Sequence, residues 1–221
     1  MKSQNENYFL NDIESLMKKS YETKLKCIML NIENTGCQKN DQILELSAIE
    51  IENFKITGKM IHVYINPRVP VLKNVNKLNK IRYYDYDDYW KHYVQDPKKQ
   101  LQNLINFIGN DSYLIIHNIS DFYLLKNELN YWNLPEIQKE RFRSTLEIGI
   151  KIYKLKNEDI NITKIENFYY YYEISKYSDD IYFTYSLYNC MMKSKLFIHL
   201  YEDFNKINDE KKKYEISMSL L

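Results

Sequence analysis

The stretch that decides the fold is Lys26–Glu52, which reads KCIMLNIENTGCQKNDQILELSAIEIE. Its first half begins with four apolar residues at 27–30 and reaches a turn at Thr35-Gly36, which predicts a buried strand followed by a turn. Its second half is rich in apolar residues over 43–51 and predicts another strand. Three polar residues of that second strand are expected on its other face: Glu45, Ser47 and Glu50. Together the two halves predict a hairpin within a buried sheet.

Asn31 and Glu33 lie at the far end of the first predicted strand. Side chains two positions apart in a strand point to the same side, so these two aim at one place. Polar residues rarely serve as packing material beside a core strand. The pair is therefore a candidate functional site.

Residues 31–36, NIENTG, resemble the D-x-E-T-T-G first motif of the DEDDh 3′–5′ exonucleases. This family includes the proofreading epsilon subunit of bacterial DNA polymerase III and RNase T, and its domains have a ribonuclease H-like fold. Asn31 stands where the family carries a metal-binding Asp. The resemblance thus departs from the family at the first ligand position.

A second motif follows the predicted strand at 113–116. Residues 117–125, HNISDFYLL, resemble the family pattern H-N-x-x-F-D-x-x-F-L. An alignment without a gap places Phe122 at the position of the family's second Asp, so that this ligand is lost. An alignment with one residue deleted places Asp121 there and matches more of the following residues, so we prefer Asp121.

A third motif is found at residues 175–180, SKYSDD, which resemble H-x-x-x-x-D without a gap. Ser175 replaces the family's His, and Asp180 keeps the carboxylate. Each motif alone is weakly specific, but the three occur in the family's order. The resemblance covers roughly residues 24–193.

The resemblance implies a site for two divalent ions, held about 4 Å apart in such enzymes. Mg²⁺ and Mn²⁺ prefer carboxylate oxygens. The retained carboxylates are Glu33, Asp121 and Asp180, while Asn31 and Ser175 replace the bridging Asp and the general-base His. A neutral amide bridges cations poorly, and a serine hydroxyl does not accept a proton near pH 7; loss of a general base alone costs about 10²–10⁴-fold in rate.

These replacements predict a catalytically inactive site that binds Mg²⁺ or Mn²⁺ weakly or not at all. The resemblance also implies which residues would contact a nucleic-acid strand. They are Thr35, His117 and Asn118.

Composition bounds the function further. The net charge of +1 over 221 residues gives no global attraction to nucleic acid. Three dispersed cysteines, Cys27, Cys37 and Cys190, argue against a disulfide framework and fit a reducing compartment. No apolar run is long enough to span a membrane, and the first residues lack the apolar core of a signal peptide. The sequence predicts a soluble, intracellular protein.

The expected architecture is α/β, with a mixed central sheet that begins as an antiparallel three-strand meander and is flanked by helices. The third strand is predicted over 60–65, and helices over 98–108, 122–131 and 148–155. One helix is expected to end near Met192 and a separate one to follow from 195. The predicted divisions are an N-terminal helical extension over 1–23, an exonuclease-like domain over 24–193, and a C-terminal helical extension over 194–221.

Three functions follow from these features. The first is an inactive exonuclease-like accessory or structural subunit of a nucleic-acid-processing assembly, with other protein subunits as partners and a single-stranded DNA or RNA 3′ end as a further ligand. The second is an active, Mn²⁺-preferring 3′–5′ exonuclease in which Asp179, Asp121 or Glu147 supplies the missing ligands. The third is a purely structural interaction protein, whose interface would include the tyrosine-rich segment 82–93.

Overall fold

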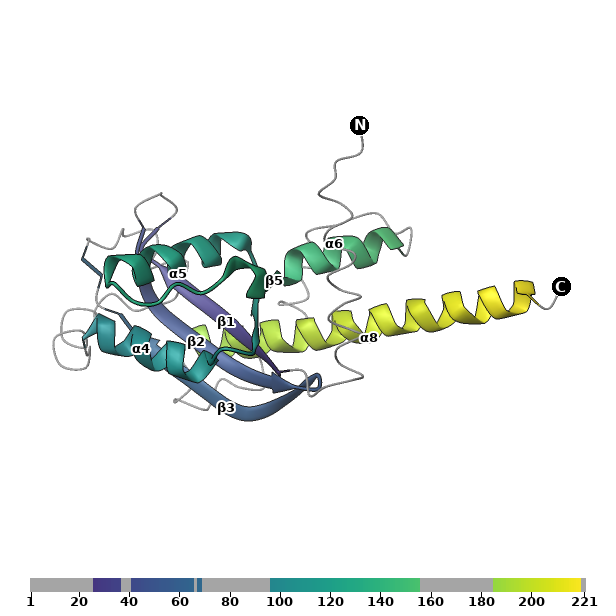
Figure 1. Ribbon diagram of the computed structural model, residues 1–221, viewed down its shortest axis with the longest axis horizontal. Helices are drawn as coiled ribbons and strands as arrows, with labels where there is room; N and C mark the ends of the chain where they lie inside the picture. Colours follow the sequence, from purple (N-terminus) through teal and green to yellow (C-terminus); the bar gives the residue numbers. More distant parts are fainter. Residues whose placement is uncertain (1–25, 37–40, 66, 69–95, 156–184, 220–221) are drawn as a thin grey trace, which may run out of the picture.

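The computed structural model describes residues 26–36, 41–65, 67–68, 96–155 and 185–219. Within them, five strands form one mixed sheet in the order β3-β2-β1-β4-β5 (Figure 1). β1 to β3 pair antiparallel, and β4 and β5 run parallel to β1. The strands are β1 (Lys26–Asn34), β2 (Ile43–Glu52), β3 (Lys55–Tyr64), β4 (Tyr113–Ile116) and β5 (Phe142–Ser144). The predicted mixed sheet with its antiparallel meander is confirmed.

The helices are α4 (Pro97–Ile108), α5 (Ile119–Tyr131), α6 (Thr145–Leu155) and α8 (Tyr185–Ser219). The start of α4 is set by Asp96, whose carboxylate accepts a hydrogen bond from the Lys98 amide at 2.9 Å, and by Pro97 in the first turn. α4 ends at Gly109, whose φ of 63° is the left-handed conformation that glycine adopts readily. Local sequence thus fixes both ends of this helix.

The third strand begins at Lys55 rather than at Met60 as predicted. Asn53 and Phe54 both have positive φ, 49° and 58°, so β2 returns as β3 through a two-residue turn. Such turns match the twist of paired strands and let the pairing start at once. The three-residue strand β5 was not predicted, because it is too short to show an alternating pattern.

The prediction of two separate helices around residues 193–195 is wrong, because α8 is a single helix from Tyr185 to Ser219. The segment Lys193-Ser194-Lys195 contains neither Gly nor Pro to end it. The Ser194 hydroxyl donates to the Cys190 carbonyl at 2.8 Å and so satisfies its hydrogen bond within the helix. The C-terminal part of α8 runs out past the sheet (Figure 1).

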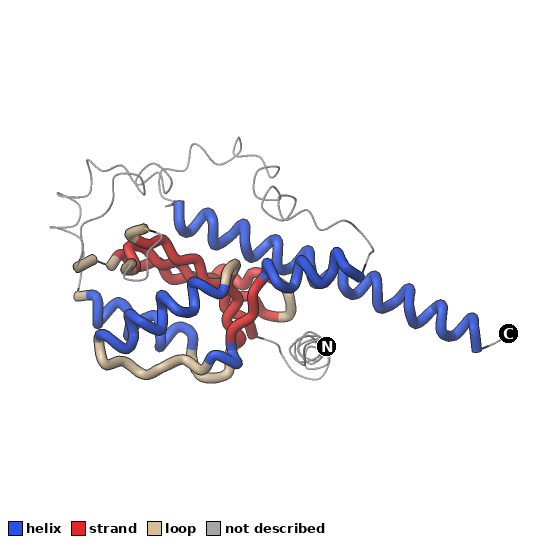
Figure 2. Tube along the Cα trace, turned by 90° about the horizontal axis from the view of Figure 1, so that it is seen from above, coloured by secondary structure: helices blue, strands red, loops and turns tan. Residues whose placement is uncertain are grey.

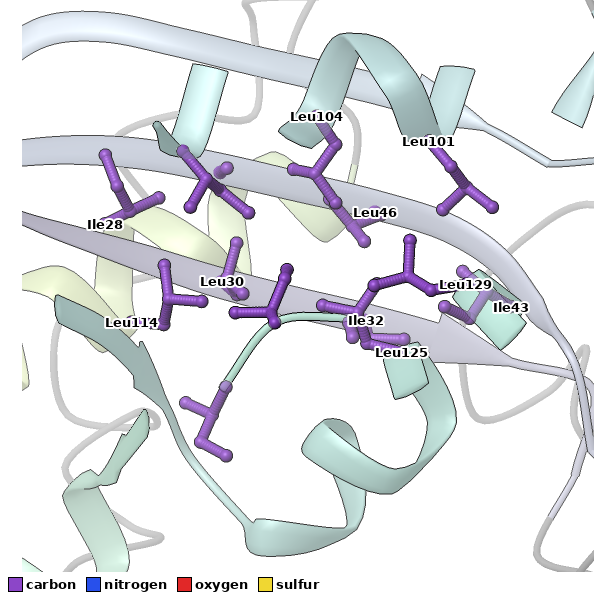
Figure 3. Close-up of a cluster of buried hydrophobic side chains, with 14 of the residues drawn as sticks. Ile28, Leu30, Ile32, Ile43, Leu46, Leu101, Leu104, Leu114, Leu125 and Leu129 are labelled. Atoms are coloured by element: carbon purple, nitrogen blue, oxygen red, sulfur yellow. The ribbon is translucent and has the colours of Figure 1, made fainter. Parts of the chain in front are cut away.

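Helices cover both faces of the sheet (Figure 2). α4 and α5 pack on one face against the β1 residues Ile28, Leu30 and Ile32, as Figure 3 shows. α6 and α8 pack on the other face, where Cys27 and Met29 of β1 meet apolar residues of both helices. The inward residues of α8 in that cluster are Cys190, Leu196, Phe197, Leu200 and Phe204. Alternate β1 side chains therefore enter two different cores.

The polar residues of β2 do not share one outer face, contrary to the prediction. Glu45, Ser47 and Glu50 are all buried, and strand alternation places Glu50 on the α4–α5 side, opposite Glu45 and Ser47. Each glutamate has a partner that makes its burial tolerable. The Glu45 carboxylate lies 2.6 Å from His62 Nε2, and that of Glu50 lies 2.8 Å from Lys26 Nζ and 2.9 Å from Lys59 Nζ.

Several predictions fall outside the described residues. They concern the N-terminal helical extension over 1–23, the tyrosine-rich segment 82–93, and the third motif with Ser175, Asp179 and Asp180. The domain boundaries stay predictions. In the part of the chain that the structure describes, no helix combines the length and the apolar character needed to cross a membrane.

Candidate functional site

The candidate site lies at the sheet edge where β1 and β4 both end. These two strands are parallel, with Met29 level with Ile115, so continuing the register sets Asn31 level with His117. In open α/β sheets, ligands commonly bind outside the carboxyl ends of such strands. Asn31 and Glu33 face the same side as Met29, which is the side that α8 covers.

The two β1 residues are tied together and to α8. Asn31 Nδ2 donates to Glu33 Oε1 at 3.0 Å, and Asn189 Nδ2 from α8 donates to the same oxygen at 3.2 Å. Asn31 is buried, and Glu33 is partly exposed. The Glu33 carboxylate is therefore held by two amide donors.

Lys193 of α8 provides a positive charge at the centre of this group. Its Nζ donates a hydrogen bond to Asn31 Oδ1. The lysine is spaced like the apolar residues Cys190, Phe197 and Leu200, and therefore belongs to the inward stripe of the helix. A cation on such a stripe needs polar or charged partners, and Asn31 is one of them.

Asp121 lies close enough to the group to sense its charges. Burial raises the pKa of Asp121 to about 6, the charge of Lys193 acts to lower it, and the charge of Glu33 raises it further. Asp121 also accepts a hydrogen bond from the Asn118 backbone, while the Asn118 side chain accepts one from the Ser120 amide at 3.1 Å. This reciprocal arrangement is a capping box at the start of α5. Asp121 thus has a structural role in addition to its electrostatic interaction with Glu33 and Lys193.

Phe122, the alternative residue in the second motif, points elsewhere. Its ring packs against Phe142 with centroids 4.8 Å apart and lies in the core beneath α4 and α5. Asp121, rather than Phe122, is therefore the residue of this motif that shares an electrostatic environment with Glu33.

The residues expected to contact nucleic acid make hydrogen bonds within the domain. The His117 Nδ1 lies 2.9 Å from Thr145 Oγ1, and burial lowers the pKa of His117 to about 4, with a further contribution from Lys193. Asn118 caps α5. Thr35 is buried; its hydroxyl donates to Asp41 at 3.2 Å and accepts from the Gln42 amide at 3.0 Å, which fixes the end of the hairpin.

The donors that the structure describes at this site do not fit a pair of divalent ions. Asn31 offers one neutral oxygen, and that oxygen already accepts from the Lys193 ammonium. Among the described residues, no group of three or more His, Cys, Asp or Glu side chains is clustered in a way that could hold a metal ion. An ammonium at this position also repels a metal cation. The structure brings together Asn31, Glu33 and Asp121, while Ser175 and Asp180 lie outside the described residues.

Sequence analysis missed Lys193 and Asn189. A signal was present, because Lys193 falls at an apolar position in the repeat that runs through Cys190, Phe197, Leu200 and Phe204. The prediction of a helix end near Met192 divided that repeat and hid the lysine. Which strand the lysine would meet could not be read from the repeat, because the chain separation between β1 and α8 is large.

Comparison with solved structures defines the class of fold. The nuclease domain of 3′hExo, described as a DEDDh family member and bound to rAMP, matches with a TM-score of 0.60 and 11% identity, over 81% of this chain and 93% of that one. Cell-death related nuclease 4 matches with a TM-score of 0.59 and 12% identity, over 80% and 64% of the respective chains. The fold is that of the ribonuclease H-like exonucleases.

Sequence relatives agree with this class. DNA polymerase III subunit epsilon of Buchnera aphidicola subsp. Schizaphis graminum is 31% identical over 156 residues, which cover 60% of this chain and 64% of the relative. The same subunit of Rickettsia prowazekii is 31% identical over 131 residues, covering 57% and 53%. No family model matches the chain. In its motifs, fold and relatives the chain is similar to the DEDDh exonucleases, and it spans between about half and two thirds of the length of these relatives.

Proposed function

We propose that this protein is an exonuclease-like subunit that does not cut nucleic acid and works as an accessory or structural component of a nucleic-acid-processing assembly. The observation that carries the proposal is the hydrogen bond from Lys193 to Asn31. At the first ligand position of the family, a neutral amide and an ammonium stand where catalysis needs a carboxylate and a metal. The sequence adds a second replacement, Ser175 for the general-base His.

The accessory role is supported by the relatives, which are named as a subunit of DNA polymerase III. The net charge of +1 also favours binding to protein partners over strong independent affinity for nucleic acid. Glu33 and Asp121 near the site would repel a phosphate backbone, and one ammonium balances only part of that charge. We therefore expect contacts with other subunits to hold the protein in place.

The test is degradation of 3′-labelled single-stranded DNA and RNA, with Mg²⁺ and with Mn²⁺. We expect no cleavage by the native protein and none by its Glu33→Gln variant. Cleavage by the native protein that Glu33→Gln abolishes would overturn the proposal and support an active, metal-dependent exonuclease.

A set of restored variants shows whether the site alone prevents cleavage. The double variant Asn31→Asp with Ser175→His returns both family residues but keeps Lys193, and we expect it to remain inactive. Adding Lys193→Met removes the ammonium, and cleavage is expected in this triple variant first. Loss of the general base alone is worth about 10²–10⁴-fold, so single restorations fall below detection.

Binding of the same oligonucleotides at increasing salt concentration separates an accessory that holds a strand from one that contacts only protein. A protein that neutralises several phosphates loses affinity steeply as salt rises. We expect weak binding at low salt and none near physiological salt.

A further inference from the structure

We infer that Lys193 is a built-in cation that occupies, beside Asn31 and Glu33, the place of the divalent metals of the family. This inference rests on the proposed function, because a working exonuclease would need the metals that the lysine displaces. It goes further in assigning a role to a residue of α8 that lies outside the three motifs.

Geometry on α8 supports the assignment. Asn189, Cys190 and Lys193 follow one another at helical spacing on the face that meets β1, and each makes a hydrogen bond to that strand. Cys190 Sγ lies 3.3 Å from the Met29 carbonyl oxygen, which anchors the helix next to Asn31. The backbone of α8 that carries Lys193 is therefore held against β1 by the contacts of Asn189 and Cys190.

Asn31 fits the position between Lys193 and Glu33 better than an Asp would, because it can accept from one and donate to the other. Its carbonyl oxygen accepts from Lys193, and its amide group donates to Glu33 at 3.0 Å. An Asp at this place could accept from the lysine but would repel the Glu33 carboxylate instead of donating to it. Asn31 and Lys193 thus complement each other, and the asparagine links the ammonium to Glu33 in one hydrogen-bonded chain.

Charge balance supports the same conclusion. Two divalent ions balance several carboxylates, whereas one ammonium balances fewer, and Asn31 carries one negative charge less than the family's Asp. The charge of Lys193 acts to lower the pKa of Asp121, His117 and Cys190, although burial is the largest cause of each net shift. The lysine acts on the same side chains that a metal at this edge would influence.

The test combines thermal unfolding with Mn²⁺ binding measured by electron paramagnetic resonance of free Mn²⁺, on the full chain. The native protein should show the same melting temperature in EDTA and in millimolar Mn²⁺, and no depletion of free Mn²⁺. Lys193→Met should melt at a lower temperature in EDTA, and Mn²⁺ should now bind and restore part of the loss. The matched control is Lys206→Met on the exposed side of the same helix, where the lysine head group is largely in solvent, and it should behave like the native protein.

Two more variants keep the test decisive if Lys193→Met folds poorly. Lys193→Arg keeps the charge and should remain indifferent to Mn²⁺. The double variant Asn31→Asp with Lys193→Met supplies a carboxylate and removes the ammonium, so we expect it to bind Mn²⁺ at least about tenfold more tightly than the native protein, a change equal to about 1.4 kcal/mol.

Either of two results would overturn the inference. One is Mn²⁺ binding by the native protein that is lost in Glu33→Gln. The other is a Lys193→Met protein that neither loses stability nor gains affinity for Mn²⁺. Native protein that binds Mn²⁺ without cleaving nucleic acid would contradict this inference and leave the proposed function standing, whereas Mn²⁺-dependent cleavage would contradict both.

Discussion

The sheet face under α4 and α5 and the face under α8 are built from the same strands but differ along β1. Beneath α4 and α5, the β1 side chains are Ile28, Leu30 and Ile32, and all three are apolar and buried. Beneath α8, the apolar pair Cys27 and Met29 gives way to Asn31 and Glu33. A strand that is covered on both faces normally has apolar residues on both.

The difference separates a face that serves only stability from one that also retains a polar site. Two charged groups under α8 have partners that limit the cost of their burial: Lys193 has Asn31, and Glu45 has His62. The arrangement is therefore a satisfied polar network rather than a packing defect. Three substitutions measure how far the two faces differ.

The largest effect is expected from Leu104→Ala on the apolar face. Leu104 of α4 is fully buried in the cluster of Figure 3, so truncation leaves a cavity and should lower the free energy of unfolding by about 3 kcal/mol. Urea unfolding monitored by circular dichroism measures the change. Asn103→Ala on the exposed side of the same helix is the control and should change stability by less than about 0.5 kcal/mol. A loss below about 1 kcal/mol for Leu104→Ala would mean that this face is loosely packed.

A smaller effect, dependent on pH, is expected from Glu50→Gln. Glu50 lies in β2, level with Ile28 near the start of β1, on the side of the sheet that α4 and α5 cover. A hydrogen bond from Lys26, with help from Lys59 and Thr57, lowers the pKa of Glu50 from 4.5 to about 2. Because the folded pKa lies below the unfolded one, the ionised carboxylate stabilises the fold above pH 4.5, and this stabilisation is lost as pH falls toward 2. Both lysines are partly solvent-screened, so we expect a loss of about 1–2 kcal/mol at pH 7.

Unfolding of the native protein and of Glu50→Gln at pH 7, 5 and 3 would show the two stabilities converging as the pH falls. Glu136→Gln, which alters the exposed pair with Lys126, is the control and should have little effect at any pH. A difference between native protein and Glu50→Gln that stays constant down to pH 3 would show that the ion pairs do not stabilise the fold.

The smallest effect is expected from Asn189→Ala at the polar end of the α8 face. It removes one of two amide donors to Glu33 and should cost about 1 kcal/mol or less, since Glu33 keeps Asn31 and is partly exposed. Asn205→Ala on the same helix is the control. In a double-mutant cycle with Glu33→Gln, the coupling should be at least about 0.5 kcal/mol. A coupling energy of zero would mean that the hydrogen bond from Asn189 to Glu33 does not help to hold α8 on β1.

Much of the fold could be predicted from sequence because its signals are local. The apolar runs of β1, β2 and β4 and the periodicity of α4 identify those elements directly. The start of β3 and the whole of β5 were missed, since a two-residue turn and a three-residue strand leave almost no pattern. α8 was divided in two because a polar Lys-Ser-Lys segment looks like a helix end when its packing is unknown.

For the site, the sequence by itself proposed Asn31 and Glu33 from strand alternation and Asp121 from its resemblance to the family's second motif, and these signals depend only on neighbours in the chain. It also showed that a neutral residue stands at the first ligand position. Only the tertiary structure showed that Lys193 and Asn189 approach from α8, more than 150 residues along the chain, and hydrogen-bond to that neutral residue and its neighbour. The charge at the centre of the site depends on how a helix packs across a strand, and packing between distant segments is decided by the whole fold rather than by local sequence.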